Sequence, residues 1–217
     1  MTKKKALIVY GGWEGHDPQG VAEVFQHILK KENFEVELSD TLESFEKDLS
    51  GYDLLVPVWT MGSLSGKAEE NVCAAVAAGV GIAGCHGGMC DAFRGNTLWQ
   101  FMTGSQWVAH PGNDSVTYMV NMKKSSASDL VAGIEDFCIT SEQYYIHVDP
   151  CVDVLATTTF TYPGPHMANG QMTLPVAYTK RWGEGKVYYN SLGHDRTVFD
   201  IPQVREMMRR GFLYAAR

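Results

Sequence analysis

The first half of the 217-residue chain alternates apolar runs with segments of helical periodicity, and this order restricts the fold more than any other feature. The runs read as buried strands because they are nearly continuous and rich in β-branched residues. They lie at 6–10, 34–38, 53–58 and 79–85. The helical segments lie at 20–31, 65–78 and, as a helix or helical turns, 91–102. The alternation predicts right-handed crossovers and a parallel sheet with helices on both faces.

The second half changes character, because strand-like segments there follow one another closely. They lie at 115–122, 137–145, 152–160, 176–182 and 186–192. Gly183-Glu184-Gly185 joins the last two and is a hairpin signal. The stretch 122–135 begins polar and predicts a surface excursion, and a helix is expected at 202–216. We therefore expect one domain over 1–217: a doubly wound α/β core with a partly antiparallel C-terminal extension.

Composition excludes several classes of partner and location. The formal net charge of −7 argues against a nucleic-acid surface and an anionic membrane. No apolar run reaches the roughly 18–20 residues that span a bilayer. The basic start is followed by too few apolar residues for a signal peptide. Five cysteines without a framework spacing fit a reducing compartment, so we expect a cytoplasmic protein.

Three of the seven histidines follow predicted strands, where ligands bind in open parallel sheets. His16 follows the first strand, His86 the fourth, and His194 one of the late strands. Around His86, glycines stand two residues before and two residues after, which is the spacing of a nucleophile elbow. Histidine holds the central place, so Cys85 and Cys90 are expected to be packed thiols.

Five motifs in order along the chain resemble the ThuA-like family, named for a trehalose-utilisation protein. They are GGWEGHDP, GCHGGMCDAFR, WVAHPG, SEQYYIHVDP and LPVAYTKRWGEGKVYYNSLGHD. The resemblance implies a class I glutamine amidotransferase-like fold with a flavodoxin-like sheet, and a role in carbohydrate metabolism. Because His86 stands where the amidotransferase elbow carries cysteine, glutamine hydrolysis through a thiolate is not expected.

The candidate site combines these strand ends with residues that the resemblance adds. The expected catalytic residues are His86, Glu142 and His194. The expected substrate contacts are Trp13, His16, Trp59, Gly87, Asp91, Arg94, His110 and Tyr144. Alternation in the strand at 137–145 would place Glu142 and Tyr144 on one face.

Several of these residues also have a purely structural interpretation. Asp17-Pro18 next to His16 can simply cap the first helix. Asp91 and Arg94 can form an i, i+3 pair or bind a hydroxyl-rich or anionic ligand. Aromatic residues such as Trp13 and Trp59 either fill the core or stack on a sugar.

Two function classes remain open from the sequence. The favoured one is an enzyme that acts on a sugar or keto-sugar glycoside, with His86 as general acid or base and Glu142 and His194 assisting. A variant adds a divalent metal such as zinc, for which His16, His86, His110 and His194 are the candidate ligands. The alternative is a non-catalytic module that binds a small polyol. The expected partner is a small sugar or polyol, and a homo-oligomer is left open.

Overall fold

The structure, a computed structural model, describes residues 3–123 and 129–217. Their main sheet has the strand order β2-β1-β3-β4-β11-β10-β9-β6-β7. The parallel part consists of β1 (Lys5–Gly12), β2 (Glu35–Ser39), β3 (Leu54–Thr60), β4 (Gly81–Cys85) and β11 (Gly185–Asn190). The predicted strands of the first half are thus confirmed to within a few residues at each end.

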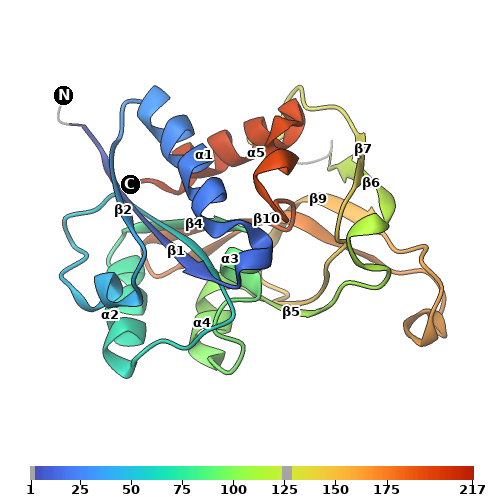
Figure 1. Ribbon diagram of the computed structural model, residues 1–217, viewed down its shortest axis with the longest axis horizontal. Helices are drawn as coiled ribbons and strands as arrows, with labels where there is room; N and C mark the ends of the chain where they lie inside the picture. Colours follow the sequence, from blue (N-terminus) through green and yellow to red (C-terminus); the bar gives the residue numbers. More distant parts are fainter. Residues whose placement is uncertain (1–2, 124–128) are drawn as a thin grey trace.

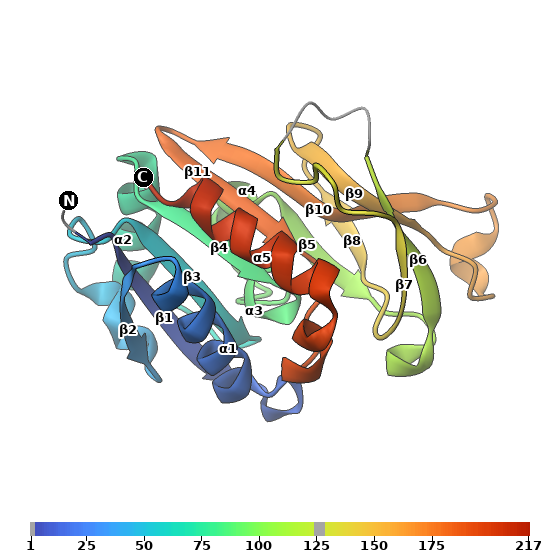
Figure 2. The ribbon, with the colours of Figure 1, turned by 90° about the horizontal axis from the view of Figure 1, so that it is seen from above.

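Helices cover both faces of this sheet, as the alternation predicts (Figures 1 and 2). On one face lie α1 (Pro18–Lys31) and α5 (Pro202–Ala215), and on the other lie α2 (Gly66–Ala77) and α4 (Thr97–Thr103). Each face has its own apolar core, one around Phe25 and Phe212 and the other around Val76 and Trp99. The α5 helix approaches β11 so closely that a Cβ on Gly211 would stand 2.2 Å from the Tyr188 ring.

The antiparallel extension continues the same sheet. The hairpin of β10 (Thr173–Trp182) and β11 turns at Gly183-Glu184, and Gly183 takes a φ of 57°. β9 (Asp153–Thr159), β6 (Thr117–Met122) and β7 (Phe137–Thr140) follow in antiparallel order. A separate two-stranded sheet pairs β5 (Ser105–Ala109) with β8 (Tyr145–Val148). The mixed α/β class is therefore confirmed, but β5 and, except for Tyr145, β8 lie outside the predicted strands.

The strand predicted at 137–145 is wrong in its middle. Residues 141–144 connect β7 to β8, which pair with different partners in different sheets. Their side chains are all buried, so alternation between two faces does not apply to them.

Two other predictions need correction. The helix expected at 91–102 is replaced by a short α3 (Gly87–Cys90), a turn, and α4, because Phe93 takes a left-handed φ of 52°. Of the expected surface excursion, residues 124–128 lie outside the described residues, and Val131 and Ile134 pack into the core.

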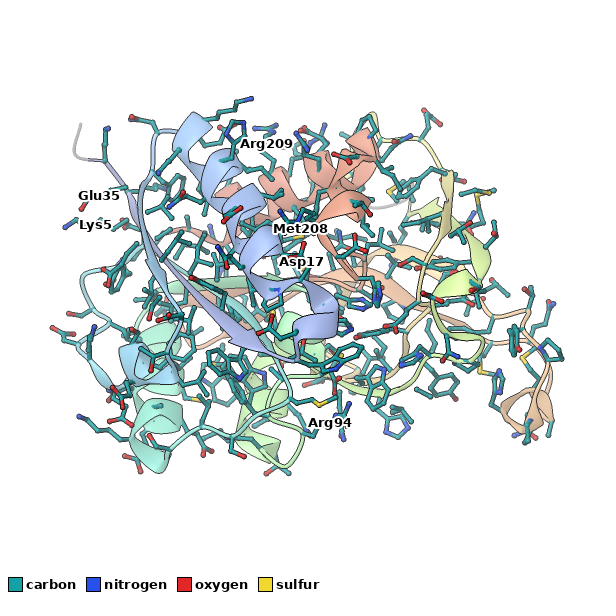
Figure 3. The ribbon with its side chains drawn as sticks, viewed as in Figure 1. Lys5, Asp17, Glu35, Arg94, Met208 and Arg209 are labelled. Carbon is teal, nitrogen blue, oxygen red and sulfur yellow. The ribbon has the colours of Figure 1, made fainter. Side chains whose placement is uncertain are left out.

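The orientation of the parallel strands fixes where a site can form. Lys5 and Glu35 face each other at the amino ends of β1 and β2, at the left edge of Figure 3, whereas Asp17 lies beyond the carboxyl end of β1. Within the described ranges, no helix has both the length and the apolar character needed to cross a bilayer.

Candidate functional site

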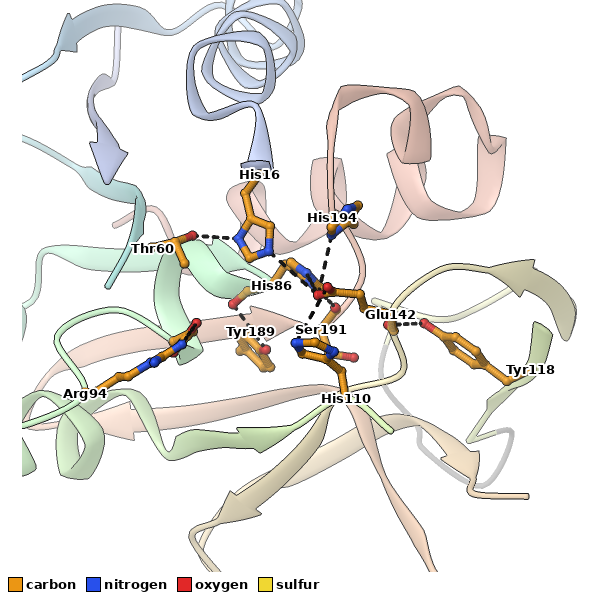
Figure 4. Close-up of polar contacts among 11 residues, drawn as sticks. His16, Thr60, His86, Arg94, His110, Tyr118, Glu142, Tyr189, Ser191 and His194 are labelled. Atoms are coloured by element: carbon orange, nitrogen blue, oxygen red, sulfur yellow. Dashed lines mark hydrogen bonds and ion pairs between the residues drawn. The ribbon is translucent and has the colours of Figure 1, made fainter. Parts of the chain in front are cut away.

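Four histidines converge on one carboxylate at the carboxyl ends of the parallel strands (Figure 4). His16 ends a short 3-10 turn after β1, His86 follows β4, and His194 follows β11. His110 comes after β5, and Glu142 comes from the connection between β7 and β8. The site therefore joins the parallel half of the molecule to the antiparallel half.

The turn around His86 has the shape of an elbow. His86 itself takes φ 46° and ψ −137°, outside the regions that non-glycine residues favour. The neighbouring glycines are needed for close packing, since a Cβ on Gly88 would meet the Val58 backbone at 2.9 Å. Cys85 is buried beside the elbow, and burial raises the pKa of its thiol. The rigid turn thus presents an imidazole and leaves the preceding thiol inert.

Both nitrogens of His86 are engaged. Nδ1–H donates to the backbone carbonyl of Ser191 at 2.7 Å, and Nε2 lies 3.1 Å from Glu142 Oε2. The ring also stacks on Tyr144, with centroids 3.9 Å apart. Burial lowers the pKa of His86 to about 4, despite the opposing effect of Glu142. Burial thus disfavours the imidazolium form of His86, whereas the carboxylate that faces its Nε2 favours it.

Two further imidazoles approach the same oxygen of Glu142. His16 Nδ1 hydrogen bonds to Thr60 Oγ1 at 2.8 Å, and its Nε2 lies 3.7 Å from Oε2. His194 Nδ1 lies 3.5 Å from Oε2, and this contact raises the pKa of His194. His110 differs, because its Nε2 lies 3.7 Å from the other oxygen, Oε1.

Glu142 is the charged centre of the site. It is 5% exposed, and the Tyr118 hydroxyl donates to its backbone carbonyl at 3.0 Å. Burial alone would raise the pKa of this carboxyl, but His16, His194 and His86 together hold it well below its usual range. The site thus holds a carboxylate enclosed by imidazoles.

Three distances in this donor set are close to those in a four-coordinate metal site. Glu142 Oε2 lies 3.1, 3.5 and 3.7 Å from the nitrogens of His86, His194 and His16. In a tetrahedral zinc site with bonds of about 2.0–2.1 Å, ligand atoms stand roughly 3.3–3.4 Å apart. All four donors lie within 4.8 Å of one another. Zinc commonly accepts imidazole and carboxylate together.

The predicted substrate contacts divide into two groups. Trp13 is 46% exposed and lies edge-on against His16, so its ring is available at the mouth of the site. Trp59 instead packs on the core under the β1 and β3 loops. Gly87 is a spacer, because a Cβ there would stand 2.6 Å from His16 Nδ1.

Asp91 and Arg94 form the i, i+3 pair that was one of the two expectations. The Arg94 guanidinium donates to both carboxylate oxygens, at 2.5 and 2.9 Å, and lies 4.4 Å over the Trp107 ring. Trp107 in turn lies 5.5 Å from His110, centroid to centroid. Arg94 is therefore linked to the histidine cluster through aromatic contacts.

The cap predicted at the start of the first helix is only partly confirmed. Pro18 begins α1 as expected, but Asp17 makes no side-chain capping bond and instead pairs with Arg196. Sequence reasoning also missed Thr60 and Ser191, which orient two of the histidines. Thr60 ends β3, so the strand-end rule could have indicated it, whereas the Ser191 carbonyl leaves no signal in a sequence.

The family model and the similar solved structures both include ThuA or ThuA-like proteins. The family model ThuA, described as trehalose utilisation, matches residues 5–215. A ThuA-like protein from Parabacteroides merdae gives a TM-score of 0.78 at 18% identity, covering 99% of this chain and 90% of that one. One from Bacteroides uniformis gives 0.76 at 13% identity, covering 98% and 91%. A β-galactosidase from Rahnella sp. R3 gives 0.63 at 19% identity, covering 99% of this chain and 31% of that enzyme. No match is found among curated proteins.

Proposed function

The chain belongs to the ThuA family, described as trehalose utilisation and hence tied to carbohydrate use, and from that premise we propose a metal-dependent enzyme acting on a keto-sugar or its glycoside. His16, His86, His194 and Glu142 hold the divalent ion, with zinc the best match to the donor set. The reaction moves a proton on the carbon beside the sugar carbonyl.

The observation that supports the metal is the contact between His86 and Glu142. The Ser191 carbonyl only accepts hydrogen bonds, so it fixes the His86 proton on Nδ1. Nε2 then faces a carboxylate oxygen 3.1 Å away, so either a proton on Nε2 or a metal ion must lie between the two atoms. A proton there makes a buried imidazolium, which burial disfavours, and we therefore infer that a metal ion takes its place. A hydrogen bond that fixes the distal nitrogen is also the usual partner of a metal-bound histidine.

The burial of the His86 side chain argues for a ligand and against an acid–base catalyst. The sequence predicts His86 as general acid or base, but its side chain is only 2% exposed and both nitrogens are occupied. A group that exchanges protons with a substrate must come within hydrogen-bond reach of it. We therefore give His86 the role of a ligand, and the acid–base role passes to a more accessible group.

A divalent ion held by these four residues would have to accept the sugar carbonyl as a fifth ligand, and would then act as a Lewis acid that polarises the carbonyl and stabilises the negative charge formed there. The protein supplies the surroundings. Trp13 offers an exposed aromatic face for a sugar ring. Arg94 has two of its three nitrogens on Asp91, so the pair offers directed N–H donors with little net charge. This neutral pair favours a hydroxyl-rich substrate over an anionic one.

Elemental analysis tests the metal directly. Protein purified without chelator or nickel resin should carry about one zinc or similar ion per chain. His194→Ala should lose it, whereas His27→Ala, an exposed histidine on α1 away from the site, should keep it. Clearly sub-stoichiometric metal in the native protein refutes the proposal. Full metal with saturable polyol binding, but no chemistry on any keto-sugar, would instead identify a binding module.

A further inference from the structure

The four histidines of the site are not equivalent. His16, His86 and His194 all face Oε2 of Glu142, and their side chains are 8%, 2% and 18% exposed. His110 faces Oε1 and is 28% exposed. The donor cluster whose atoms lie within 4.8 Å of one another contains the first three histidines and not His110. The carboxylate therefore has a metal side and an open side.

The surroundings of His110 also differ from those of His16 and His86. Its ring lies 5.5 Å from the Trp107 ring at an interplanar angle of 38°, and 6.2 Å from the Tyr144 ring at 22°, centroid to centroid. Its Nδ1 is buried and has no hydrogen-bond partner among the described residues. No hydrogen bond at Nδ1 therefore fixes a tautomer of His110, as the Ser191 carbonyl does for His86, and His194 Nδ1 likewise has no hydrogen-bond partner among these residues. Neighbouring aromatic rings thus hold the His110 ring in place, whereas no hydrogen bond at Nδ1 holds its proton.

We propose that His110 lies outside the metal's ligand set and is the catalytic residue that carries the substrate's proton. This inference rests on the proposed function. His110 lies between the metal ligands and the Arg94–Trp107 contact, where a bound sugar would reach it. Glu142 Oε1, 3.7 Å from Nε2, supplies the counter-charge when the imidazole becomes cationic. One carboxylate thus serves the ion through one oxygen and His110 through the other.

The step balances without a further reactant. Neutral His110 takes the proton from the carbon beside the carbonyl, and the C–H electron pair becomes the C=C bond of an enediolate. The carbonyl oxygen takes the negative charge, and His110 takes the positive one. Return of the proton to the same carbon restores both reactants. Its return to the former carbonyl carbon, with the hydroxyl proton passing to the oxyanion, gives the isomeric sugar.

Metal content provides the first test, and it needs no substrate. His110→Gln should bind zinc within a few-fold of the native affinity, as should the control His27→Gln. His16→Gln and His194→Gln should bind zinc at least about 100-fold more weakly. A loss of this size exceeds the loss of affinity that follows when a residue that only orients a metal ligand is replaced. Equal loss of zinc from His110→Gln and His194→Gln would overturn the assignment.

Proton exchange provides the second test. Zinc-loaded protein is incubated in deuterium oxide with D-fructose or the methyl glycoside of a ketoglucose, and proton NMR follows the signal beside the carbonyl. His110→Gln should slow the exchange by about 100-fold or more at full metal occupancy. Added imidazole should restore exchange to His110→Gly, because the site is partly open.

The outcomes separate the two proposals. Native exchange rates in His110→Gln overturn the role of His110 and leave the proposed reaction standing. Loss without rescue by imidazole, at full metal occupancy, also overturns the proton-carrier role. No exchange by the native, zinc-bound protein with either sugar overturns the proposed reaction and the role of His110 together.

Discussion

Replacing Glu142 by Gln should remove the stabilisation that zinc gives to the native protein. The substitution keeps the size of the side chain but removes the anion that faces the nitrogens of His16, His86 and His194. An amide oxygen is a much weaker ligand than a carboxylate for an ion held by imidazoles. The effect is therefore expected on metal-dependent stability, which thermal unfolding measures without a known substrate.

The size of the effect follows from mass action. Zinc present at about 100 times its Kd, and bound only by the folded state, adds roughly 2.7 kcal/mol. For 217 residues, the unfolding entropy is about 0.46 kcal/mol/K, so the Tm should rise by about 6 °C. If Glu142→Gln weakens binding about 100-fold, the added stability falls to roughly 0.4 kcal/mol, or about 1 °C.

Thermal melts of chelator-treated protein, with and without added zinc, measure both values. Glu70→Gln is the matched control, because it removes the same charge from an exposed position on α2 and should keep the full rise. A rise of the native size in Glu142→Gln would show that the carboxylate is not a ligand. No rise in the native protein would refute the metal itself.

Three further substitutions test packing and charge away from the site. Asp149→Ala leaves the buried Lys180 ammonium without its partner at 2.8 Å, so urea unfolding should show a loss of about 3 kcal/mol; a loss under about 1 kcal/mol would contradict this. Gly211→Ala places a methyl group 2.2 Å from the facing tyrosine ring of β11, and should cost about 1–3 kcal/mol without changing metal content. The Glu206 carboxyl has its pKa lowered to about 2, chiefly by its hydrogen bond with Arg209. A carboxyl whose pKa is lower in the folded state stabilises that state at any pH above its pKa in the unfolded state, and this stabilisation is lost as the pH falls towards the folded-state pKa. The free energy of unfolding of Glu206→Gln should therefore depend less on pH between about pH 4.5 and 2. An unchanged acid limb in stability measured against pH would argue against that ion pair.

The parallel half of the fold could be predicted because its signals are local. A run such as 53–58 is apolar throughout only if both faces of the strand are covered, and α2 shows its buried face by spacing alone. Ligands bind at the carboxyl ends of the strands in open parallel sheets, and this rule correctly predicted that His16, His86 and His194 lie at one edge of the sheet. These predictions depend on neighbours within one strand–helix unit.

The antiparallel half could be predicted less well, because its pairing is not local. The segment 137–145 is apolar enough for one strand, yet it divides at Ser141 because β8 pairs with β5 and not with β6. Single-sequence patterns do not show which partner a strand will choose. As a result Glu142 was expected within a strand but lies in the connection between two strands.

The division of roles that we propose among the histidines likewise could not be predicted from the sequence. Nothing in the chain order distinguishes His110 from His16 as a ligand, because the difference lies in which oxygen of Glu142 each approaches. The hydrogen-bond partners of the imidazoles could not be predicted either, because every residue type has a backbone carbonyl such as the one of Ser191 that binds His86.

The origin of Glu142 in the β7–β8 connection has a consequence for the order of folding. The other donors follow parallel strands: those before His16 and His86 meet through short crossovers, whereas β11, before His194, pairs with the distant β4, with Val187 opposite Ile82. Glu142 joins them only after the antiparallel strands have paired across β10 and β11, which requires contacts of high sequence separation. An ion held at this site therefore binds late and cannot nucleate the chain. Its release would report the opening of the junction between the two halves before either half unfolds.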